Sequence, residues 1–304
     1  MHRTWRILGA VAGVALFAAA VWFALAQVDF TTLRSVPPAY LAGLAGLVAA
    51  NILLTGGLFW VITLSFDASP RVGLIRMTEL IAVSGLLNYV PAVRAGLWGR
   101  AAYLKLKHGL PVRQSAVILL AVLTLAGMVT GLVLAAWLML GVHAVAGASA
   151  GGAIVLSTLL GLVAGRLLKR DVTAGWSWLV LRYADTLVMA ARLWLAFAAV
   201  GSPIGFNEAL VAGAVAQVVR LTGLTPNGLG LSEWVIAWLV ARSGPGVDVA
   251  VLSQLPAALL DRAVEVVVSL AAGAGAAWRL RGVAGNPRRE ESATDEHGGV
   301  EVER

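Results

Sequence analysis

The stretch that decides the fold is AVILLAVLTLAGMVTGLVLAAWLML, residues 116–140, and it contains no charged side chain. A helix needs roughly 20 apolar residues to cross the hydrocarbon core of a bilayer, so this stretch is long enough to span one. It lacks the alternation of apolar and polar residues that a membrane barrel strand requires. The pattern therefore predicts a membrane-spanning α-helix.

Other apolar blocks approach or exceed this length, at residues 10–26, 40–64, 150–164, 176–200 and 249–270. The 304 residues are 59% hydrophobic and 13% charged, whereas soluble domains carry about 25% charged residues. A soluble domain of this size could not bury all these blocks, and strands open to lipid would leave backbone groups without hydrogen-bond partners. The expected fold class is all-α, a polytopic integral membrane protein.

Residue content excludes several kinds of chemistry. The chain has no cysteine, and its four histidines, His2, His108, His143 and His297, do not pair at a metal-ligand spacing. We find no catalytic triad, Walker loop or dinucleotide fingerprint. We therefore expect no catalytic residue, no metal, no cofactor and no nucleic-acid partner, and we predict that the protein is not an enzyme.

The two ends of the chain differ from its middle. The block at 10–26 is longer than the core of a usual signal peptide, which favours an uncleaved first helix over the alternative of a cleaved signal. Residues 282–304 hold six acidic and three basic side chains and little apolar content, which is typical of a disordered extension. We expect a transmembrane domain at 1–281 and a disordered cytoplasmic tail at 282–304.

Basic residues near the ends of apolar blocks indicate orientation, because they stay mostly in the cytoplasm. All the clusters fall on one side of the membrane if the amino terminus is cytoplasmic. We therefore predict a multi-pass protein of the cell (inner) membrane with both termini in the cytoplasm. The clusters lie at Arg3 and Arg6, Arg71 and Arg76, Arg166 with Lys169 and Arg170, and Arg279 with Arg281.

A first broken segment follows the second apolar block. The apolar residues 80–90 are too few to span, and Pro91 stops a helix there. The densest basic cluster of the chain follows, between Arg94 and Arg113, and it would lie outside if residues 80–90 crossed the membrane. We therefore interpret residues 76–110 as a re-entrant hairpin that enters from the cytoplasm. The alternative is an amphipathic segment on the membrane surface.

A second broken segment contains Pro226 and repeats the pattern of the first. An offset of 135 residues pairs Pro91 with Pro226 and Gly109 with Gly244. We infer an internal repeat, with motifs around 76–141 and 206–276. Three spanning blocks lie between the hairpins, so the repeats have inverted topology, as in many transporters whose sites lie at broken helices. The expected total is about six spanning helices plus two re-entrant hairpins.

Ionised residues inside apolar segments mark either a polar path or a structural ion pair, because a buried charge in a membrane is costly. Arg94, Arg220 and Glu233 lie in or beside the broken segments, so we expect them to line one cavity, with Arg220 and Glu233 paired when it is empty. Arg182 and Asp185, three residues apart, can pair on one helix. The alternative for each residue is an ion pair that only fixes packing. The other candidates are Arg192, Asp261 and Arg262, with Glu265 on the same helix face as Asp261.

Two short motifs lie in the broken segments. The first is PAVRAGLWGR at 91–100, and the second is PNGLGLSE at 226–233, followed by Arg262 in the next apolar block. At these motifs the chain resembles the membrane domain of lysylphosphatidylglycerol synthases, a flippase-like family that includes stand-alone membrane proteins. The resemblance extends to about residue 280. It departs at Leu97, where the family has an acidic residue.

The resemblance implies transbilayer transport (flipping) of an anionic phospholipid or a lipid-linked cell-envelope intermediate. The implied partners are a membrane lipid or polyprenyl-linked substrate, together with envelope-synthesis enzymes. The soluble aminoacyl-transfer domain of the synthases has no counterpart after residue 280, so we expect no lipid aminoacylation. The alternatives are a membrane-embedded transferase, or a non-transporting partner, in envelope lipid or glycan synthesis. The predicted substrate-binding residues are Arg94, Gly96, Arg100, Arg220, Pro226, Gly228, Gly230, Glu233 and Arg262.

Overall fold

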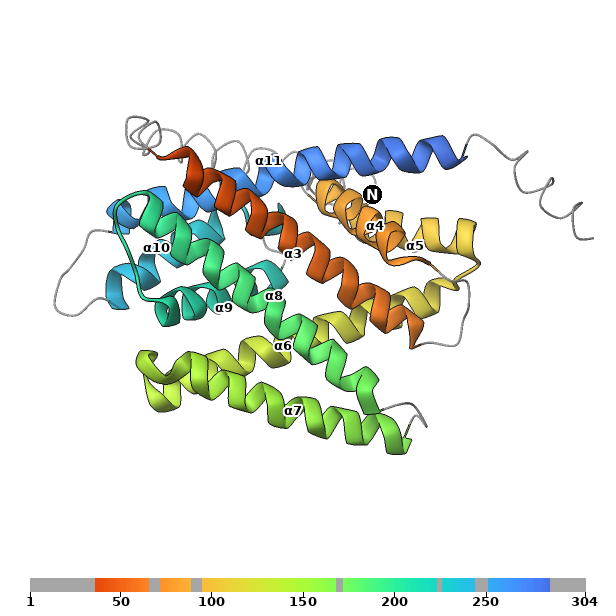
Figure 1. Cartoon of the computed structure of the whole chain (residues 1–304), viewed down its shortest axis with the longest axis horizontal. Helices are drawn as coiled ribbons and strands as arrows, with labels where there is room; N and C mark the ends of the chain where they lie inside the picture. The colour runs from red at the N-terminus through yellow and green to blue at the C-terminus, as the bar shows by residue number, and fades with distance from the viewer. Residues whose placement is uncertain are drawn as a thin grey trace, which may run out of the picture.

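The computed structural model describes residues 36–65, 72–88, 95–167, 172–222, 226–243 and 251–284, and the regular structure in these ranges is entirely helical (Figure 1). The prediction of an all-α chain is therefore confirmed for the described residues. The apolar block at 10–26 and most of the predicted tail lie outside them. The elements are α3 (Pro38–Leu64), α4 (Leu74–Leu87), α5 (Ala95–His108), α6 (Val112–Leu140), a 3₁₀ turn (Val142–Ala144), α7 (Val145–Leu167), α8 (Val172–Ala199), α9 (Phe206–Thr222), a second 3₁₀ turn (Pro226–Gly228), α10 (Leu231–Ser243) and α11 (Val251–Ala284).

Three described segments are long and apolar enough to cross a membrane, namely Pro38–Leu64, Val112–Leu140 and Val142–Leu162. Proline and glycine set the ends of two of them. Pro38 occupies the first turn of α3, where its missing N–H has no helical partner to lose, and α6 stops at Gly141 with φ +75°. Helices α8 and α11 are longer still than α3, at 28 and 34 residues, but they contain charged residues, several of which are buried.

Two pairs of short helices coincide with the two broken segments. Helices α4 and α5 pack against each other, and so do α9 and α10. Each helix has 13 to 17 residues, so it extends about 20–26 Å and is shorter than the hydrocarbon core of a bilayer. Gly228 and Gly230, in the turn between α9 and α10, have φ of +78° and +83°. Glycine adopts this left-handed conformation without the steric cost that a Cβ would add.

The offset of 135 residues also relates the boundaries of the helices. Adding 135 to the bounds of α3 and α5 gives 173–199 and 230–243, and α8 and α10 cover Val172–Ala199 and Leu231–Ser243. Helices α4 and α9 end at Leu87 and Thr222, which are 135 apart. Helices α6 and α11 follow in the same order. Helices α3, α4 and α5 thus have counterparts of closely matching position in α8, α9 and α10.

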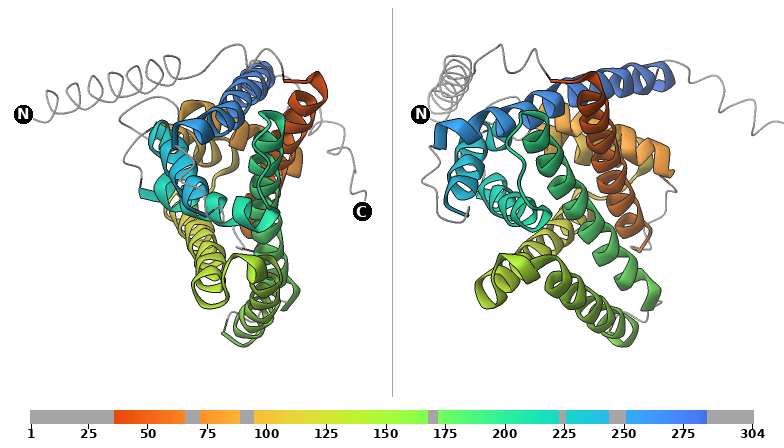
Figure 2. Two further views of the ribbon diagram at one scale, coloured as in Figure 1. Left: turned by 90° about the vertical axis from the view of Figure 1, so that its left-hand side faces the viewer. Right: turned by 60° about the vertical axis from the view of Figure 1, so that its left-hand side comes forward.

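The packing partners of these helices correspond in the same way. Helix α4 packs against α3 and α11, and its counterpart α9 packs against α8 and α6. Helices α3 and α8 lie side by side and run in opposite directions (Figure 2). Their pairing is antiparallel because Leu44, near the start of α3, packs with Ala196, near the end of α8. Helix α10 packs against α9 and α11, and α8 also packs against α9 and α11.

Helix α9 is the most enclosed of the short helices. Residues 209–214 are buried all round, which leaves no face of this stretch for solvent or lipid. Its small residues permit this: Gly213 faces Met189 of α8, where an added Cβ would lie 3.3 Å from the methionine methyl carbon. Arg220 lies near the end of α9, on the continuation of this enclosed stretch, and is partly buried in the helix bundle.

Candidate functional site

The candidate site is a group of six ionised side chains from four helices, here called the arginine–carboxylate cluster. Its formal charge is zero, because three arginines face three carboxylates. Five of the residues are buried, and Arg220 is partly exposed. The members are Arg192 of α8, Arg220 of α9, Glu233 of α10, and Asp261, Arg262 and Glu265 of α11.

Arg192 anchors the cluster to α11. Its side chain is fully buried, and it donates from Nε and Nη2 to the two oxygens of Asp261 at 2.9 and 3.0 Å. Nη2 also donates to Glu265 at 2.6 Å. A planar guanidinium matched to both oxygens of a carboxylate is the strongest arrangement that an ion pair offers. Removing one partner of such a buried pair would leave an uncompensated charge, so Arg192 has a large structural role.

Glu265 is the centre of the cluster. Besides Arg192, its carboxylate accepts from Arg262 Nη1 at 2.7 Å and from Arg220 Nη2 at 3.4 Å. The Arg220 contact is the longest of the three, and the side chain of Arg220 is 16% exposed, against 0% and 5% for the other arginines. Arg220 is therefore the arginine with the weakest internal pairing and the easiest access from outside.

The glycine-rich turn holds the opposite side of the cluster. Arg262 donates through Nη2 to the backbone carbonyl of Asn227, and its Nε lies 3.3 Å from Glu233 Oε1. The Ser232 hydroxyl lies 2.9 Å from both Glu233 Oε1 and the Gly228 carbonyl oxygen, so it can donate to only one of them at a time. The turn and the charged cluster are therefore one connected hydrogen-bonded unit.

Gly228 touches the cluster directly. A Cβ at this position would lie 2.8 Å from Cγ of Arg220, closer than a real Cβ contact allows. The positive φ adds strain for any other residue. The glycine therefore lets the turn approach the stem of Arg220.

Three buried polar atoms in the cluster have no hydrogen-bond partner among the described residues: Arg192 Nη1, Arg220 Nε and Glu233 Oε2. Buried polar atoms in proteins are nearly always paired, so each of these positions calls for an explanation. Two of the three are N–H donors on guanidinium groups, which are suited to oxygens of an anion. The cluster therefore contains two buried guanidinium donors without a described acceptor.

The predicted residues of the first half lie elsewhere. Gly96 packs α5 against the end of α4, since an added Cβ would lie 2.0 Å from the Ser84 carbonyl oxygen. Arg100 is buried with its guanidinium 3.8 Å from the centre of the Phe59 ring, a cation–π contact, and it has no ion pair with a described carboxylate. No described contact joins Gly96 or Arg100 to the cluster. Arg94, predicted to share the cavity, lies outside the described residues.

The second-half residues converge, but with different partners from those expected. Pro226 begins the 3₁₀ turn, and Gly228, Glu233 and Arg262 all meet there, as the motif suggests. The expected pair of Arg220 with Glu233 is wrong, because Arg220 pairs with Glu265 and Glu233 pairs with Arg262. The reason is geometric: the start of α10 directs Glu233 towards α11.

Sequence reasoning left Arg192, Asp261 and Glu265 out of the predicted substrate-binding set. The sequence does mark these three residues, since each places a charge within an apolar block. Asp261 and Glu265 do share a helix face that meets another helix, as expected, and that helix is α8. What the sequence could not provide was the identity of the facing arginine, because Arg192 is 69 residues away from Asp261.

A second polar contact lies between α3 and α8. Asp185 pairs with Arg182 at 2.6 Å, which confirms the predicted pair, and it also accepts from Asn51 and from Thr55, the latter at 3.3 Å. Both oxygens of Asp185 accept hydrogen bonds, so the carboxylate is satisfied and joins the two helices, whereas Arg182 Nε has no hydrogen-bond partner among the described residues. It fits the structural interpretation of Asp185.

Within the described ranges no group of three acidic or histidine side chains is placed to hold a metal ion. Comparisons with protein families, with curated proteins and with solved structures give no match to this chain. The class is therefore defined by the fold and the site alone: a helical protein with membrane-length apolar helices and a buried, charge-neutral arginine–carboxylate cluster at a helix break.

Proposed function

We propose that the protein moves an anionic phospholipid or a lipid-linked cell-envelope intermediate across the bilayer, as the resemblance to the flippase-like family implies. The observation that supports this most is the pair of unpaired guanidinium donors, Arg192 Nη1 and Arg220 Nε, in a buried cluster beside a glycine-rich helix break. Phosphate oxygens are the natural acceptors for such donors. Broken helices are where transporters place their substrates.

The proposed topology uses the matched halves of the fold. Helices α8 and α11 span the membrane as well, since their buried charges are paired within the protein and do not face lipid. The short pairs α4–α5 and α9–α10 are re-entrant hairpins. With the block at 10–26 the count is six spanning helices and two hairpins. Because α3 and α8 are antiparallel counterparts, the two halves are inverted, with both termini on the cytoplasmic side.

The proposed mechanism is a competition for Arg220. In the structure Arg220 is held by Glu265 at 3.4 Å, which is longer than a normal charged hydrogen bond. A lipid phosphate would take Arg220, while Glu265 would keep Arg192 and Arg262 as partners. No carboxylate would be left unpaired, so the exchange avoids the usual cost of breaking a buried ion pair. Contact between the Arg220 stem and Gly228 would transmit the change to the turn.

A membrane-embedded transferase for envelope lipids or glycans is the second candidate. The observation in its favour is that Glu233 of α10 comes together in space with Asp261 and Glu265 of α11. Each of these carboxylates has an arginine partner, whereas general acid–base catalysis or metal binding needs a carboxylate that is free to act. A non-transporting partner of envelope enzymes is the remaining alternative, and it requires no substrate at the cluster.

The test is a proteoliposome assay that follows movement of a fluorescent anionic lipid between leaflets. We expect Arg220→Gln to abolish movement and Arg220→Lys to restore it in part, because lysine keeps the charge but lacks the planar two-point contact. The matched control is Arg242→Gln, on the same hairpin, where the guanidinium lies over the Trp238 ring and outside the cluster. Wild-type movement by a folded Arg220→Gln variant would remove the cluster from the mechanism.

A further inference from the structure

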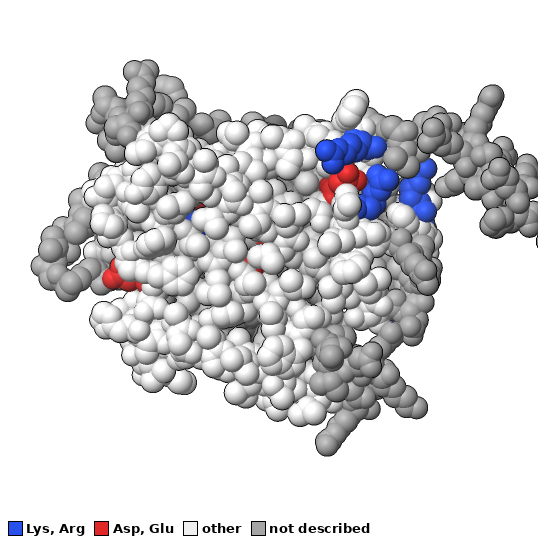
Figure 3. All heavy atoms as spheres, in the orientation of Figure 1, with Lys and Arg blue, Asp and Glu red and all other residues white. Residues whose placement is uncertain are grey.

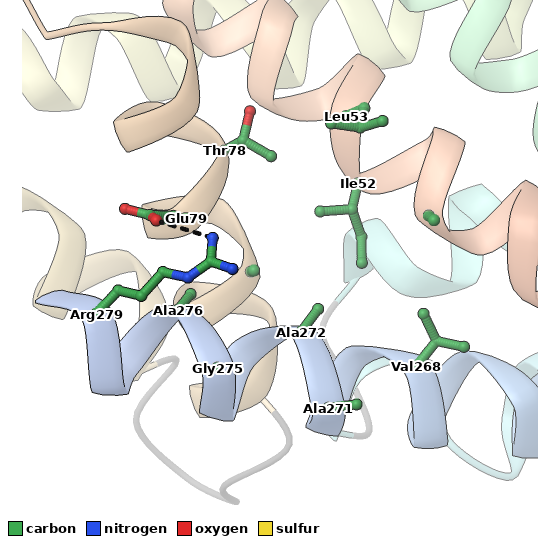
Figure 4. Close-up of a pocket in the computed structure, with 12 residues that line it drawn as sticks. Ile52, Leu53, Thr78, Glu79, Val268, Ala271, Ala272, Gly275, Ala276 and Arg279 are labelled. Carbon is green, nitrogen blue, oxygen red and sulfur yellow. Dashed lines mark ion pairs between the residues drawn. The ribbon is translucent and has the colours of Figure 1, made fainter.

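A groove of about 380 Å³ lies between α3, α4 and α11 (Figure 4). This volume falls within the range of about 300–1,000 Å³ that is typical of ligand sites. None of the residues that line the groove belongs to the arginine–carboxylate cluster. Those residues are Ala49, Ile52, Leu53, Thr78, Glu79, Ala82, Val268, Ala271, Ala272, Gly275, Ala276 and Arg279.

The walls of the groove are apolar, and small residues create its space. Ile52 and Leu53 of α3 lie across from Ala271, Ala272 and Gly275 of α11, as Figure 4 shows. An added Cβ at Gly275 would meet nothing within 4 Å. Leu53 is 61% exposed, so the groove is open to the surroundings of the protein. In a membrane those surroundings are acyl chains.

One end of the groove is charged. Glu79 lies between Arg279, at 3.6 Å, and Arg76, at 3.4 Å, so the three groups have a net charge of +1. The side chain of Arg279 is 69% exposed. Both contacts are longer than a normal charged hydrogen bond, which leaves the arginines able to bind another anion.

Further positive charge lies beside this end. Burial and the charges of Arg76 and Lys107 lower the pKa of His108, at the end of α5, which places these basic groups close to one another. On the face shown in Figure 3, most of the visible lysine and arginine atoms gather at the upper right together with some acidic atoms, a separate acidic patch lies at the left edge, and the rest of the described surface is mostly uncharged. A basic rim at one end of an apolar surface is the pattern that suits an anionic lipid at a membrane interface.

We propose that this groove binds one acyl chain of an anionic phospholipid, with the lipid phosphate at Arg279 and Arg76. The inference rests on the proposed function for its membrane placement. The occupant is argued from shape and charge together, because an apolar groove that ends in an exposed arginine is complementary to an acyl chain attached to a phosphate. A purely apolar helix or a second protein copy would leave the charged end without a counterpart.

The groove leads towards the cluster along α11. Val268, at its inner end, lies three residues after Glu265, so the two positions are neighbours on successive turns. From Arg279 to Glu265 the helix rises about 21 Å. A lipid bound in the groove would thus lie alongside the helix that holds three of the six cluster residues. The groove is accordingly assigned as the site of lipid entry from the cytoplasmic leaflet.

The test uses phosphatidylglycerol that carries a photoactivatable diazirine in one acyl chain, incorporated into vesicles with the full chain. After illumination, mass spectrometry should find the label on residues 49–53 and 268–276. Gly275→Leu fills the groove and should lower this labelling by about tenfold, the equivalent of 1.4 kcal/mol. The matched control is Gly151→Leu in α7, where an added Cβ also meets open space. Labelling that maps elsewhere, or that Gly275→Leu leaves unchanged, would overturn the inference.

A second arm tests the headgroup. Arg279→Gln should reduce labelling by the phosphatidylglycerol probe and leave labelling by a diacylglycerol probe, which has no phosphate, unchanged. Equal effects on both probes would remove the phosphate from the proposal. Because the chain has no cysteine, Ala272→Cys can also be paired with Ala18→Cys or with a second copy. Efficient disulfide formation by either pair would show a protein occupant and would contradict the lipid assignment.

Failure of this inference can be told apart from failure of the proposed function. Labelled groove residues without lipid movement between leaflets would retain a lipid site and reject transport. Lipid movement that depends on Arg220 but not on Gly275, with label outside the groove, would retain transport and reject this entry site.

Discussion

Asn51 of α3 donates a hydrogen bond to Asp185 of α8, and the two residues are 134 positions apart, one fewer than the offset that relates the two halves of the chain. Helices α3 and α8 therefore touch at nearly equivalent points. A twofold axis through this contact would exchange the two helices. This contact is the one that the proposed inverted repeats would place where α3 crosses α8.

The proposed inverted topology makes a prediction about the two pairs of short helices. Reporter fusions at Lys107 and at Ser243, at the ends of α5 and α10, should report opposite sides of the membrane, with Lys107 in the cytoplasm. The physical reason is that inverted repeats expose equivalent residues to opposite faces. The measurement is the activity of a reporter that works on only one side. Equal activity at both positions would rule out inversion.

Replacement of Asp185 should destabilise the joint between α3 and α8. Asp185→Leu leaves Arg182 buried without its partner, at a cost of about 3–5 kcal/mol, and should lower the Tm of the protein in detergent. The double variant Arg182→Leu with Asp185→Leu should recover most of the loss, since it removes both charges. Thr55→Val removes one hydrogen bond of 3.3 Å and should have a smaller effect. A double variant less stable than Asp185→Leu would contradict this account.

Substitutions of Arg192 and Arg220 should have different effects, the first on stability and the second on lipid movement. Arg192→Leu leaves Asp261 without both of its hydrogen bonds and should lower the Tm strongly, by the equivalent of about 3–5 kcal/mol. Arg220→Gln loses one ion pair of 3.4 Å and a weak contact of 3.9 Å to Met189 Sδ, so the protein should remain folded and lose lipid movement instead. Thermal unfolding, with Arg242→Leu as the exposed control, separates the two. Equal losses of stability at both arginines would show that the whole cluster is structural.

Alanine at Gly228 should disturb the cluster. The left-handed conformation costs a residue with a Cβ roughly 1–2 kcal/mol, and the new methyl group would meet Cγ of Arg220 at 2.8 Å. We expect Gly228→Ala to reduce lipid movement, while Gly147→Ala in α7, where a Cβ meets open space, leaves it unchanged. The readout is transport normalised to folded protein. Equal tolerance at both glycines would show that the turn is an ordinary loop.

Alanine at Gly96 should disrupt the first hairpin. Its Cβ would lie 2.0 Å from the Ser84 carbonyl oxygen, which belongs to the backbone and cannot rotate away. Gly99→Ala, one turn later, meets only Leu87 Cδ1 at 3.4 Å and should be tolerated. Limited proteolysis between α4 and α5 should therefore be faster for Gly96→Ala than for Gly99→Ala. Similar rates would mean that the close packing of α4 and α5 is unimportant.

The sequence by itself determined the helical class of the described residues, the three apolar stretches of membrane length and the two helix breaks. These are local properties: an apolar stretch of membrane length must satisfy its own backbone as a helix, and Pro226 with Gly228 and Gly230 ends one. The offset of 135 residues between similar segments could also be found in the sequence, because finding it requires only that the chain be compared with itself. The predicted pair of Arg182 and Asp185 succeeded for the same reason, since three residues separate them on one helix.

Only the tertiary structure decided which charges meet. Arg220 could have faced Glu233 or Glu265, and its pairing with Glu265 depends on how α9 and α11 are rotated about their axes. Arg192 entered the cluster because α8 crosses α11, although 69 residues separate it from Asp261. The groove at Gly275 likewise exists only where α3, α4 and α11 leave a space together. Such contacts depend on the positions of several helices at once, and no local pattern of residues specifies them.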